Sequence, residues 1–304
     1  MFEPSSVPLR RLVWIALALS LGAAVSLGIT RFAYGLLLPV MREDLDWGYT
    51  LAGAMNTANA GGYLLGALAT PWLMRRFGSA RVLLAGALLA SGFMAASGFF
   101  TAAGPLLLQR LLAGVASAFV FVAGGLLAAR LGAQAPQHAG LLLGLYYGGT
   151  GWGISASALA VPGLLRAAAD VPHGWSWAWW GLALLCPLAT LVLWWPASIL
   201  QKSELLAHTG QAPAAHLIHE PLPWRRMMPA LAGYTLFGVG YIGYMTFVIA
   251  LLREQGVAPA AITLFYALLG LAVVASARIW AGLLNRAKGG GALALLNALL
   301  GVAT

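Results

Sequence analysis

Three arginines lie inside stretches of this sequence that are otherwise apolar: Arg31, Arg110 and Arg278. A guanidinium group can hold a carboxylate or a phosphate through two parallel hydrogen bonds, so arginines in apolar stretches are candidates for anion binding. Arg31 is the clearest candidate, because Val40, at the end of its apolar stretch, lies nine residues further on, about 13 Å along a helix. A side chain at that depth does not easily extend to the surface. We therefore expect Arg31 to face the protein interior.

The acidic residues offer Arg31 and Arg110 no neighbouring counter-ion, because all eight lie in expected loops or termini. They are Glu3, Glu43, Asp44, Asp46, Asp170, Glu204, Glu220 and Glu254. We hypothesise that Arg31 helps to bind a small organic anion, such as a carboxylate, in a central cavity. The alternative, that Arg31 holds helix ends or backbone carbonyls together, stays open. For Arg110, which lies nearer the expected surface, extension of the side chain to water is a further alternative.

Other polar side chains recur at the spacing of a helix face. The pairs are Asn56 with Asn59, Thr30 with Tyr34, and Tyr241 with Tyr244. Buried amides and phenols need hydrogen-bond partners, so these faces are expected to point inward. The predicted substrate site contains Arg31, Tyr34, Asn56, Asn59, Arg110, Tyr241 and Tyr244. Hydrogen bonding between helices without ligand contact is the alternative.

The elements that position these residues are expected to be membrane-spanning helices. The sequence is 61% hydrophobic and only 8% charged, whereas soluble domains are about a quarter charged. Its charge-free runs reach the roughly 17 to 25 residues that a helix needs to cross a bilayer. We predict an all-α polytopic membrane protein with eight complete spans and part of a ninth. The spans begin near residues 12, 49, 82, 105, 139, 176, 227 and 258, and the ninth near 291.

A glycine-rich run, GLYYGGTGWG at residues 144–153, lies in the span that begins near residue 139. The pairs Gly144 with Gly148 and Gly149 with Gly153 have the GxxxG spacing that allows two helices to approach closely. They predict close helix packing.

The cations are distributed unevenly between the two expected sides of the membrane. Eleven fall in loops on the side of the N-terminus: Arg10, Arg11, Arg75, Arg76, Arg81, Arg130, Lys202, Arg225, Arg226, Arg286 and Lys288. Only Arg42, Arg166 and Arg253 fall in the opposite loops. This bias predicts a multi-pass protein of the bacterial inner (plasma) membrane with a cytoplasmic N-terminus. The net charge of +9 then reflects topology and contact with membrane lipid, and does not indicate nucleic-acid binding.

The chain divides at its longest polar segment. We predict an N-terminal six-helix half over residues 1–197, a central cytoplasmic loop over 198–224, and an incomplete C-terminal half over 225–304. A shift of 210 residues supports this division, because it places GITRFAY (Gly28 to Tyr34) on GVGYIGY (Gly238 to Tyr244). The same shift places Arg75 and Arg76 on Asn285 and Arg286. The second half therefore looks like a copy of the first in the same orientation.

Three segments resemble motifs of the major facilitator superfamily. LMRRFGSARVLL after residue 72 resembles its loop signature, LQRLLAGVASA resembles its fourth-span motif, and ARIWAGLLNRAKGG resembles the repeated loop signature. Together with GITRFAYGLLLPVM in the first span, they are similar to the YbfB/YjiJ-type branch. The resemblance implies two pseudo-symmetric six-helix halves and a gating role for the loop residues. These are Arg75, Arg76, Gly78 and Arg81 in the first half and Asn285 and Arg286 in the second.

The sequence departs from this family pattern in two ways. The acidic position of the loop signature holds Arg75 in one half and Asn285 in the other, so the gating scheme that uses this carboxylate cannot be transferred. A family of twelve spans also requires about three helices beyond Thr304, so we expect the chain to be C-terminally truncated.

The resulting prediction is a secondary transporter that moves a small-molecule substrate by alternating access. The spans contain no carboxylate to carry a coupled proton, so facilitated diffusion and coupling through further helices both stay open. A truncated non-transporting remnant is the first alternative. A membrane-embedded enzyme is less favoured, because the spans lack a convergent group of acid, base and nucleophile.

Neither a cofactor nor a metal is expected. Cys186 is the sole cysteine, and the HLIHE order at His216 to Glu220 differs from the HExxH arrangement of zinc sites. The oligomeric state is left open.

Overall fold

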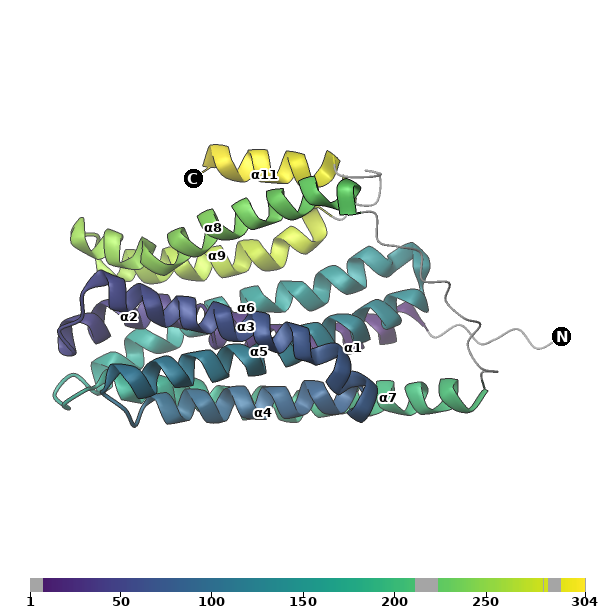
Figure 1. Cartoon of the computed structure of the whole chain (residues 1–304), viewed down its shortest axis with the longest axis horizontal. Coiled ribbons are helices and arrows are strands. Elements are labelled where there is room, and N and C mark those ends of the chain that lie inside the picture. Colours follow the sequence, from purple (N-terminus) through teal and green to yellow (C-terminus); the bar gives the residue numbers. More distant parts are fainter. Residues whose placement is uncertain (1–7, 211–223, 281, 284–290, 304) are drawn as a thin grey trace.

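The computed structural model describes residues 8–210, 224–280, 282–283 and 291–303 (Figure 1). Helices account for nearly all of these residues, and no strand occurs among them. Figure 1 shows the long helices lying side by side along the longest axis of the molecule. The predicted all-α class is therefore confirmed.

The first rod of the bundle consists of three segments: α1 (Leu9–Ala23), the π-helical η1 (Ala24–Ile29) and α2 (Ala33–Asp44). The following helices are α3 (Tyr49–Phe77), α4 (Ser79–Ser97), α5 (Ala103–Ala133), the short 3-10 helix η2 (Pro136–His138), α6 (Ala139–Ala167), α7 (Trp175–Gly210), α8 (Trp224–Glu254), α9 (Pro259–Ile279) and α11 (Gly291–Ala303). At 1.5 Å per residue, the 29 residues of α3 extend about 43 Å, more than the hydrocarbon thickness of about 30 Å.

Six of the described helical rods are long and apolar enough to cross a membrane. They are Leu9–Asp44, Ser79–Ser97, Ala103–Ala133, Trp175–Lys202, Met227–Glu254 and Pro259–Ile279. Helices α3 and α6 are as long, but their glycine, asparagine, serine and threonine residues make them less apolar. The multi-pass membrane class is supported, while the number of eight complete spans stays a prediction.

The segment expected to form the central loop is partly helical. Helix α7 continues to Gly210, so residues 198–210 extend the sixth predicted span instead of leaving it, and α8 begins at Trp224. The division of the chain into two halves stays a prediction. We call residues 8–210 the N-terminal part and residues 224–303 the C-terminal part.

Glycines set the closest approaches between helices. A Cβ atom at Gly62 of α3 would lie 1.9 Å from the carbonyl oxygen of Leu111 in α5, and one at Gly149 of α6 would lie 1.9 Å from that of Ser20 in α1. The other members of the two GxxxG pairs also face neighbouring helices: Gly153 faces Ala24, and Gly144 and Gly148 face Ala277. The predicted close packing of this run is therefore confirmed.

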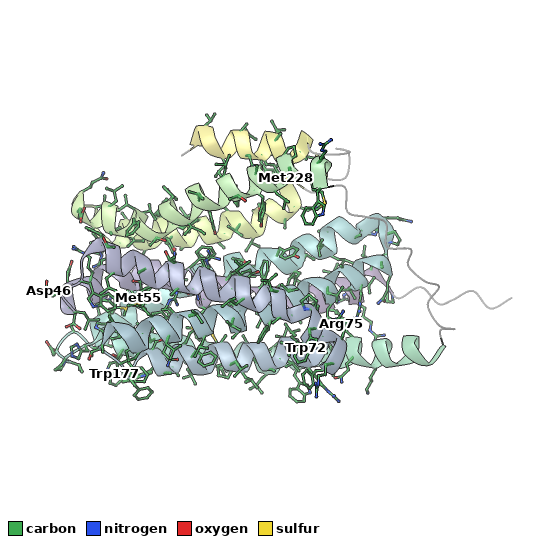
Figure 2. All side chains as sticks on the ribbon, in the orientation of Figure 1. Asp46, Met55, Trp72, Arg75, Trp177 and Met228 are labelled. Atoms are coloured by element: carbon green, nitrogen blue, oxygen red, sulfur yellow. The ribbon has the colours of Figure 1, made fainter. Side chains whose placement is uncertain are left out.

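The two ends of the bundle differ in charge. One end, here called the basic end, is formed by the starts of α1, α4, α6 and α8 and the ends of α3, α5 and α7 (Figure 1). Its helix termini and loops carry Arg10, Arg11, Arg75, Arg76, Arg81, Arg130, Lys202 and Arg225. The opposite acidic end carries Glu43, Asp44, Asp46, Asp170 and Glu254 beside Arg42, Arg166 and Arg253. Figure 2 shows Asp46 at the acidic end and Arg75 toward the basic end.

At the acidic end, Asp44 fastens α2 to the start of α7. Its Oδ2 atom accepts a hydrogen bond from Trp175 Nε1 at 2.5 Å and contacts His173 Nδ1 at 2.6 Å. We expect Asp44→Ala to lower the free energy of unfolding by about 1–2 kcal/mol, because the buried indole N–H loses a charged acceptor. Thermal unfolding of the purified protein measures this loss. Glu43→Ala removes the neighbouring exposed charge and serves as the control, and equal effects of both variants would contradict the assignment.

Candidate functional site

Arg31 lies at a break in the first rod. Within η1 and just after it, Thr30 N donates to Val25 O at 3.1 Å and Phe32 N donates to Leu27 O at 3.0 Å, both across five residues. Residues 30–32 then form a turn before α2 begins at Ala33. Insertions of this π-helical kind are frequent at functional sites, because they displace side chains and free carbonyl groups from the regular ladder. The break fixes the position from which the Arg31 side chain projects.

The guanidinium of Arg31 is half-buried and has phenols as its electrostatic neighbours. The phenols of Tyr241, Tyr63 and Tyr234 lie within electrostatic range of it. Tyr63 lies on α3, whereas Tyr234 and Tyr241 lie on α8. No carboxylate pairs with Arg31 among the residues that the structure describes. The environment thus combines one unpaired cation with hydroxyl donors from both parts of the chain.

Aromatic rings pack against two of these phenols, Tyr63 and Tyr241. In the N-terminal part, Phe121 packs against Tyr63 and Tyr147 with ring centroids 6.4 and 5.0 Å apart. Phe32, next to Arg31 in the chain, packs edge to face against Tyr241 of the C-terminal part, with ring centroids 5.8 Å apart. A small anion at Arg31 would receive charge-assisted hydrogen bonds from the guanidinium and phenols, while its apolar portion would contact aromatic rings.

Arg110 occupies a different environment, inside the N-terminal part. Its side chain is only 2% exposed, and its Nη1 atom donates to Thr30 O at 2.8 Å. The guanidinium also lies 5.0 Å from the ring centre of Tyr34 and 5.5 Å from that of Trp179. Its Nε and Nη2 atoms have no hydrogen-bond partner in the described part of the chain. The hydrogen bond from Arg110 to Thr30 O therefore stabilises the break at residues 30–32 from within the N-terminal part.

Tyr34 and Asn59 belong to this same buried group. Tyr34 Oη donates to Ala52 O at 2.7 Å, and Asn59 Nδ2 donates to Arg110 O at 3.0 Å. Both side chains are almost fully buried. Their hydrogen bonds join neighbouring helices of the N-terminal part, which is the arrangement that the interhelical alternative describes.

Asn56, Tyr241 and Tyr244 lie along the contact between the two parts or on its far side. Asn56 Nδ2 donates to Thr246 Oγ1 and so links α3 to α8. Tyr241 and Tyr244 line a cavity of about 520 Å³ between α8, α9 and α11, which Asn297 also borders. The seven predicted site residues thus divide into four groups: Arg31 with Tyr241, the buried set of Tyr34, Asn59 and Arg110, Asn56 at the contact between the two parts, and the exposed Tyr244.

The predicted gating loop joins α3 to α4 at the basic end. Gly78 has a φ of 84°, a conformation that favours glycine, and permits the sharp turn between the helices. Arg76 lies over the rings of Trp72 and Phe77 at 5.8 and 5.6 Å. The corresponding second-half residues, Asn285 and Arg286, lie outside the described residues.

Sequence reasoning missed Tyr63, Phe121, Tyr147 and Tyr234. An aromatic residue in an apolar span is equally compatible with a lipid-facing, core or cavity position, so spacing alone does not single these residues out. Their distance to Arg31 depends on how separate helices pack. No group of three or more histidine, cysteine, aspartate or glutamate side chains that could hold a metal ion occurs within the described segments.

Comparison with known proteins adds one finding to this geometry. Residues 23–304 match the model of a family described as the uncharacterised MFS-type transporter YbfB. None of the curated proteins searched matches the chain.

Proposed function

Because the chain belongs to the YbfB-type branch of the major facilitator superfamily and is therefore a membrane transporter, we propose that it carries a small organic anion by alternating access. The observation that carries the proposal is the half-buried guanidinium of Arg31, which lacks a carboxylate partner among the described residues and has three phenols within electrostatic range. A cation in a membrane interior costs about 2.5 to 3.5 kcal/mol on insertion scales, so a site that retains one favours an anionic ligand.

The aromatic neighbours favour a carboxylate with an apolar or aromatic body. Tyr63, against which Phe121 packs, belongs to the N-terminal part, and Tyr241, against which Phe32 packs, belongs to the C-terminal part. Small-molecule sites are mostly apolar with a few polar groups that fix orientation. In this proposal Arg31 binds the carboxylate, the phenols donate to it, and the rings hold the remainder of the molecule.

The contacts between the two parts support alternating access. Near the acidic end, Tyr49 Oη donates to Glu254, and deeper in the bundle, beside Arg31 in the chain, Tyr266 Oη donates to Phe32 O at 3.1 Å. Toward the basic end, the first half of α8 is largely exposed, and Leu236 is 73% exposed. We propose that this is a state closed at the acidic end, and that rocking of the two parts opens the site to the other side.

The internal repeat and the charge distribution supply the remaining elements of the proposal. Tyr241, which the 210-residue shift pairs with Arg31, is one of the three phenols within electrostatic range of it. This supports a central site between two related halves. The basic end is proposed to face the cytoplasm, since positively charged loops are retained there, and the membrane is proposed to be the bacterial inner membrane.

A matched set of ligands tests the anion assignment. Protein in lipid nanodiscs is titrated with radiolabelled benzoate, with benzamide and benzylamine as neutral and cationic competitors of nearly the same shape. We expect saturable benzoate binding that aliphatic and aromatic monocarboxylates displace and that the amide and the amine do not. Equal displacement by benzamide or benzylamine, or the absence of displaceable carboxylate binding, would contradict the proposal. Counterflow of the bound carboxylate in proteoliposomes then tests transport.

A further inference from the structure

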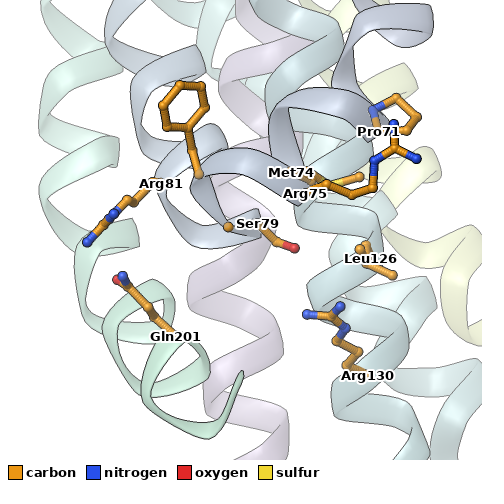
Figure 3. Close-up of a pocket in the computed structure, with 10 residues that line it drawn as sticks. Pro71, Met74, Arg75, Ser79, Arg81, Leu126, Arg130 and Gln201 are labelled. Atoms are coloured by element: carbon orange, nitrogen blue, oxygen red, sulfur yellow. The ribbon is translucent and has the colours of Figure 1, made fainter. Parts of the chain in front are cut away.

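Two cavities in the described part of the molecule differ in the chemistry of their lining. One, of about 560 Å³, lies at the turn between α3 and α4, where Arg75 and Arg81 lie on opposite sides (Figure 3). The other, of about 520 Å³ and here called the α8 cavity, lies between α8, α9 and α11 and has a mainly apolar and aromatic lining. The α8 cavity shares Tyr241 with the surroundings of Arg31. It therefore adjoins the proposed anion site.

A row of aromatic rings on α8 connects the surroundings of the cation to this cavity. Tyr234 packs against Phe237 with ring centroids 5.9 Å apart, and Phe237 stacks on Tyr241 at 5.4 Å with 12° between the ring planes. Tyr234 and Tyr241 lie within electrostatic range of Arg31, whereas Phe237 and Tyr241 line the α8 cavity. The two stacked rings thus offer a flat apolar surface that begins beside the cation and continues into the cavity.

The α8 cavity is larger than the phenyl ring of benzoate requires. A cavity of about 150 Å³ is enough for a benzene ring, and sites of about 300 to 1,000 Å³ hold ligands of drug size. Leu236, Met245 and Leu269 contribute aliphatic atoms to the lining, and Asn297 contributes an amide on the α11 side. Because burial of apolar surface favours binding in proportion to its area, this lining favours an anion with a long or bulky apolar group.

Two glycines help to leave the cavity open on its α8 side. Gly233 and Gly240, seven residues and about two turns apart on α8, both line it. Nothing in the described part of the chain lies within 4 Å of a Cβ atom placed at either residue. The situation differs from that at Gly62, where a neighbouring backbone occupies the place of a side chain. A larger residue at position 240 would therefore extend into the cavity.

We propose that the α8 cavity holds the apolar tail of the transported anion, so that the substrate is an amphipathic carboxylate larger than benzoate and Gly240 determines the size of its tail. This inference rests on the proposed function, because it places the carboxylate at Arg31. A lipid acyl chain is the competing occupant of the cavity. Under that alternative, neither the length of a ligand's tail nor a substitution at Gly240 would change carboxylate binding.

A series of 4-alkylbenzoates measures the contribution of the cavity. Each compound, from 4-methylbenzoate to 4-butylbenzoate, is used to displace radiolabelled benzoate from protein in nanodiscs. We expect affinity to rise about fourfold for each buried methylene group, and by about tenfold or more from benzoate to 4-butylbenzoate. Equal affinity along the series, with benzoate itself bound, would overturn this inference and leave the proposed function standing. Absence of displaceable carboxylate binding would overturn both.

A variant that fills the cavity then locates the alkyl tail. Gly240→Leu is expected to weaken 4-butylbenzoate binding about tenfold, because its side chain occupies the space of the tail, and to leave benzoate affinity near the wild-type level. Gly243→Leu is the matched control on the same helix. Gly243 also has nothing within 4 Å of an added Cβ atom, but it lines a separate cavity of about 350 Å³ beside Tyr49 and Phe247.

The control should retain the full rise in affinity along the series. Partition of the alkyl groups into the bilayer is the same for all proteins, so the ratio between variants reports binding to the protein. An equal loss in both variants, or no loss in Gly240→Leu, would overturn the inference. Gly233→Leu lines the same cavity and is expected to flatten the series in the same way, so it replaces Gly240→Leu if that variant does not assemble.

Discussion

Arg31→Lys is expected to weaken carboxylate binding about 10- to 150-fold, and Arg31→Gln is expected to abolish it. Lysine preserves the charge but not the planar fork that makes two parallel hydrogen bonds to a carboxylate. The loss of one hydrogen bond to a charged group costs about 1.5–3 kcal/mol, and each 1.4 kcal/mol corresponds to a tenfold change in affinity. Titration of nanodisc-embedded protein with benzoate measures the change.

The control for this comparison is Arg166→Lys. Arg166 is exposed at the end of α6, where its Nε atom donates to Pro162 O four residues before it. Binding and thermal stability should both remain at the wild-type level in Arg166→Lys. A variant Arg31→Lys that assembles normally and binds benzoate as well as the wild type would contradict the site. Failure of both Arg31 variants to assemble would instead support a structural role for this arginine.

The second substitution with a large expected effect, this time on stability, lies at the contact between α3 and α5. Gly62→Ala would place a Cβ atom 1.9 Å from Leu111 O and 2.7 Å from Leu111 C, so the two helices would have to separate. Overpacking of this kind costs about 1–3 kcal/mol, and more where backbone must move. We expect a loss of at least about 3 kcal/mol in the free energy of unfolding, seen as a lower thermal midpoint or as failed accumulation in the membrane.

Gly61→Ala provides a control in the adjacent position. Gly61 is exposed, and nothing lies within 4 Å of a Cβ atom placed there. Because alanine favours helix by about 1 kcal/mol over glycine, this variant should be neutral or slightly stabilising. Equal destabilisation by the two substitutions would contradict the conclusion that the close approach of Leu111 sets the requirement for glycine at Gly62.

The helical class and the close packing of residues 144–153 could be predicted from the sequence because both depend on local composition. Long apolar runs favour membrane helices in any tertiary context, and GxxxG spacing brings glycines to one helix face. The break at residues 30–32 could not be predicted in the same way. A π-helical turn depends on partners such as Arg110, whose guanidinium holds Thr30 O from a helix 80 residues away in the chain.

The candidate site also depends on contacts between distant helices, which the sequence does not reveal. Helical spacing correctly indicates that Asn59 and Tyr34 face inward, since both are buried, but it does not distinguish a helix contact from a ligand cavity. Arg31 and Arg110 look alike in the sequence, as single cations in apolar runs. Their packing differs: the guanidinium of Arg110 donates to Thr30 O and lies over the ring of Tyr34, whereas that of Arg31 has phenols of α3 and α8 within electrostatic range. The binding roles of these residues stay predictions.

The π-helical segment η1 (Ala24–Ile29) also changes how the first rod would respond to a change in its length. In a regular α-helix, deleting one residue turns everything beyond it by about 100° and moves an inward face toward lipid. A π-turn already holds one residue more than an α-turn, so a deletion within it can restore α geometry and leave the following helix in register. Residues 24–29 are therefore the part of this rod where a single-residue gap in related sequences is compatible with an unchanged orientation of α2.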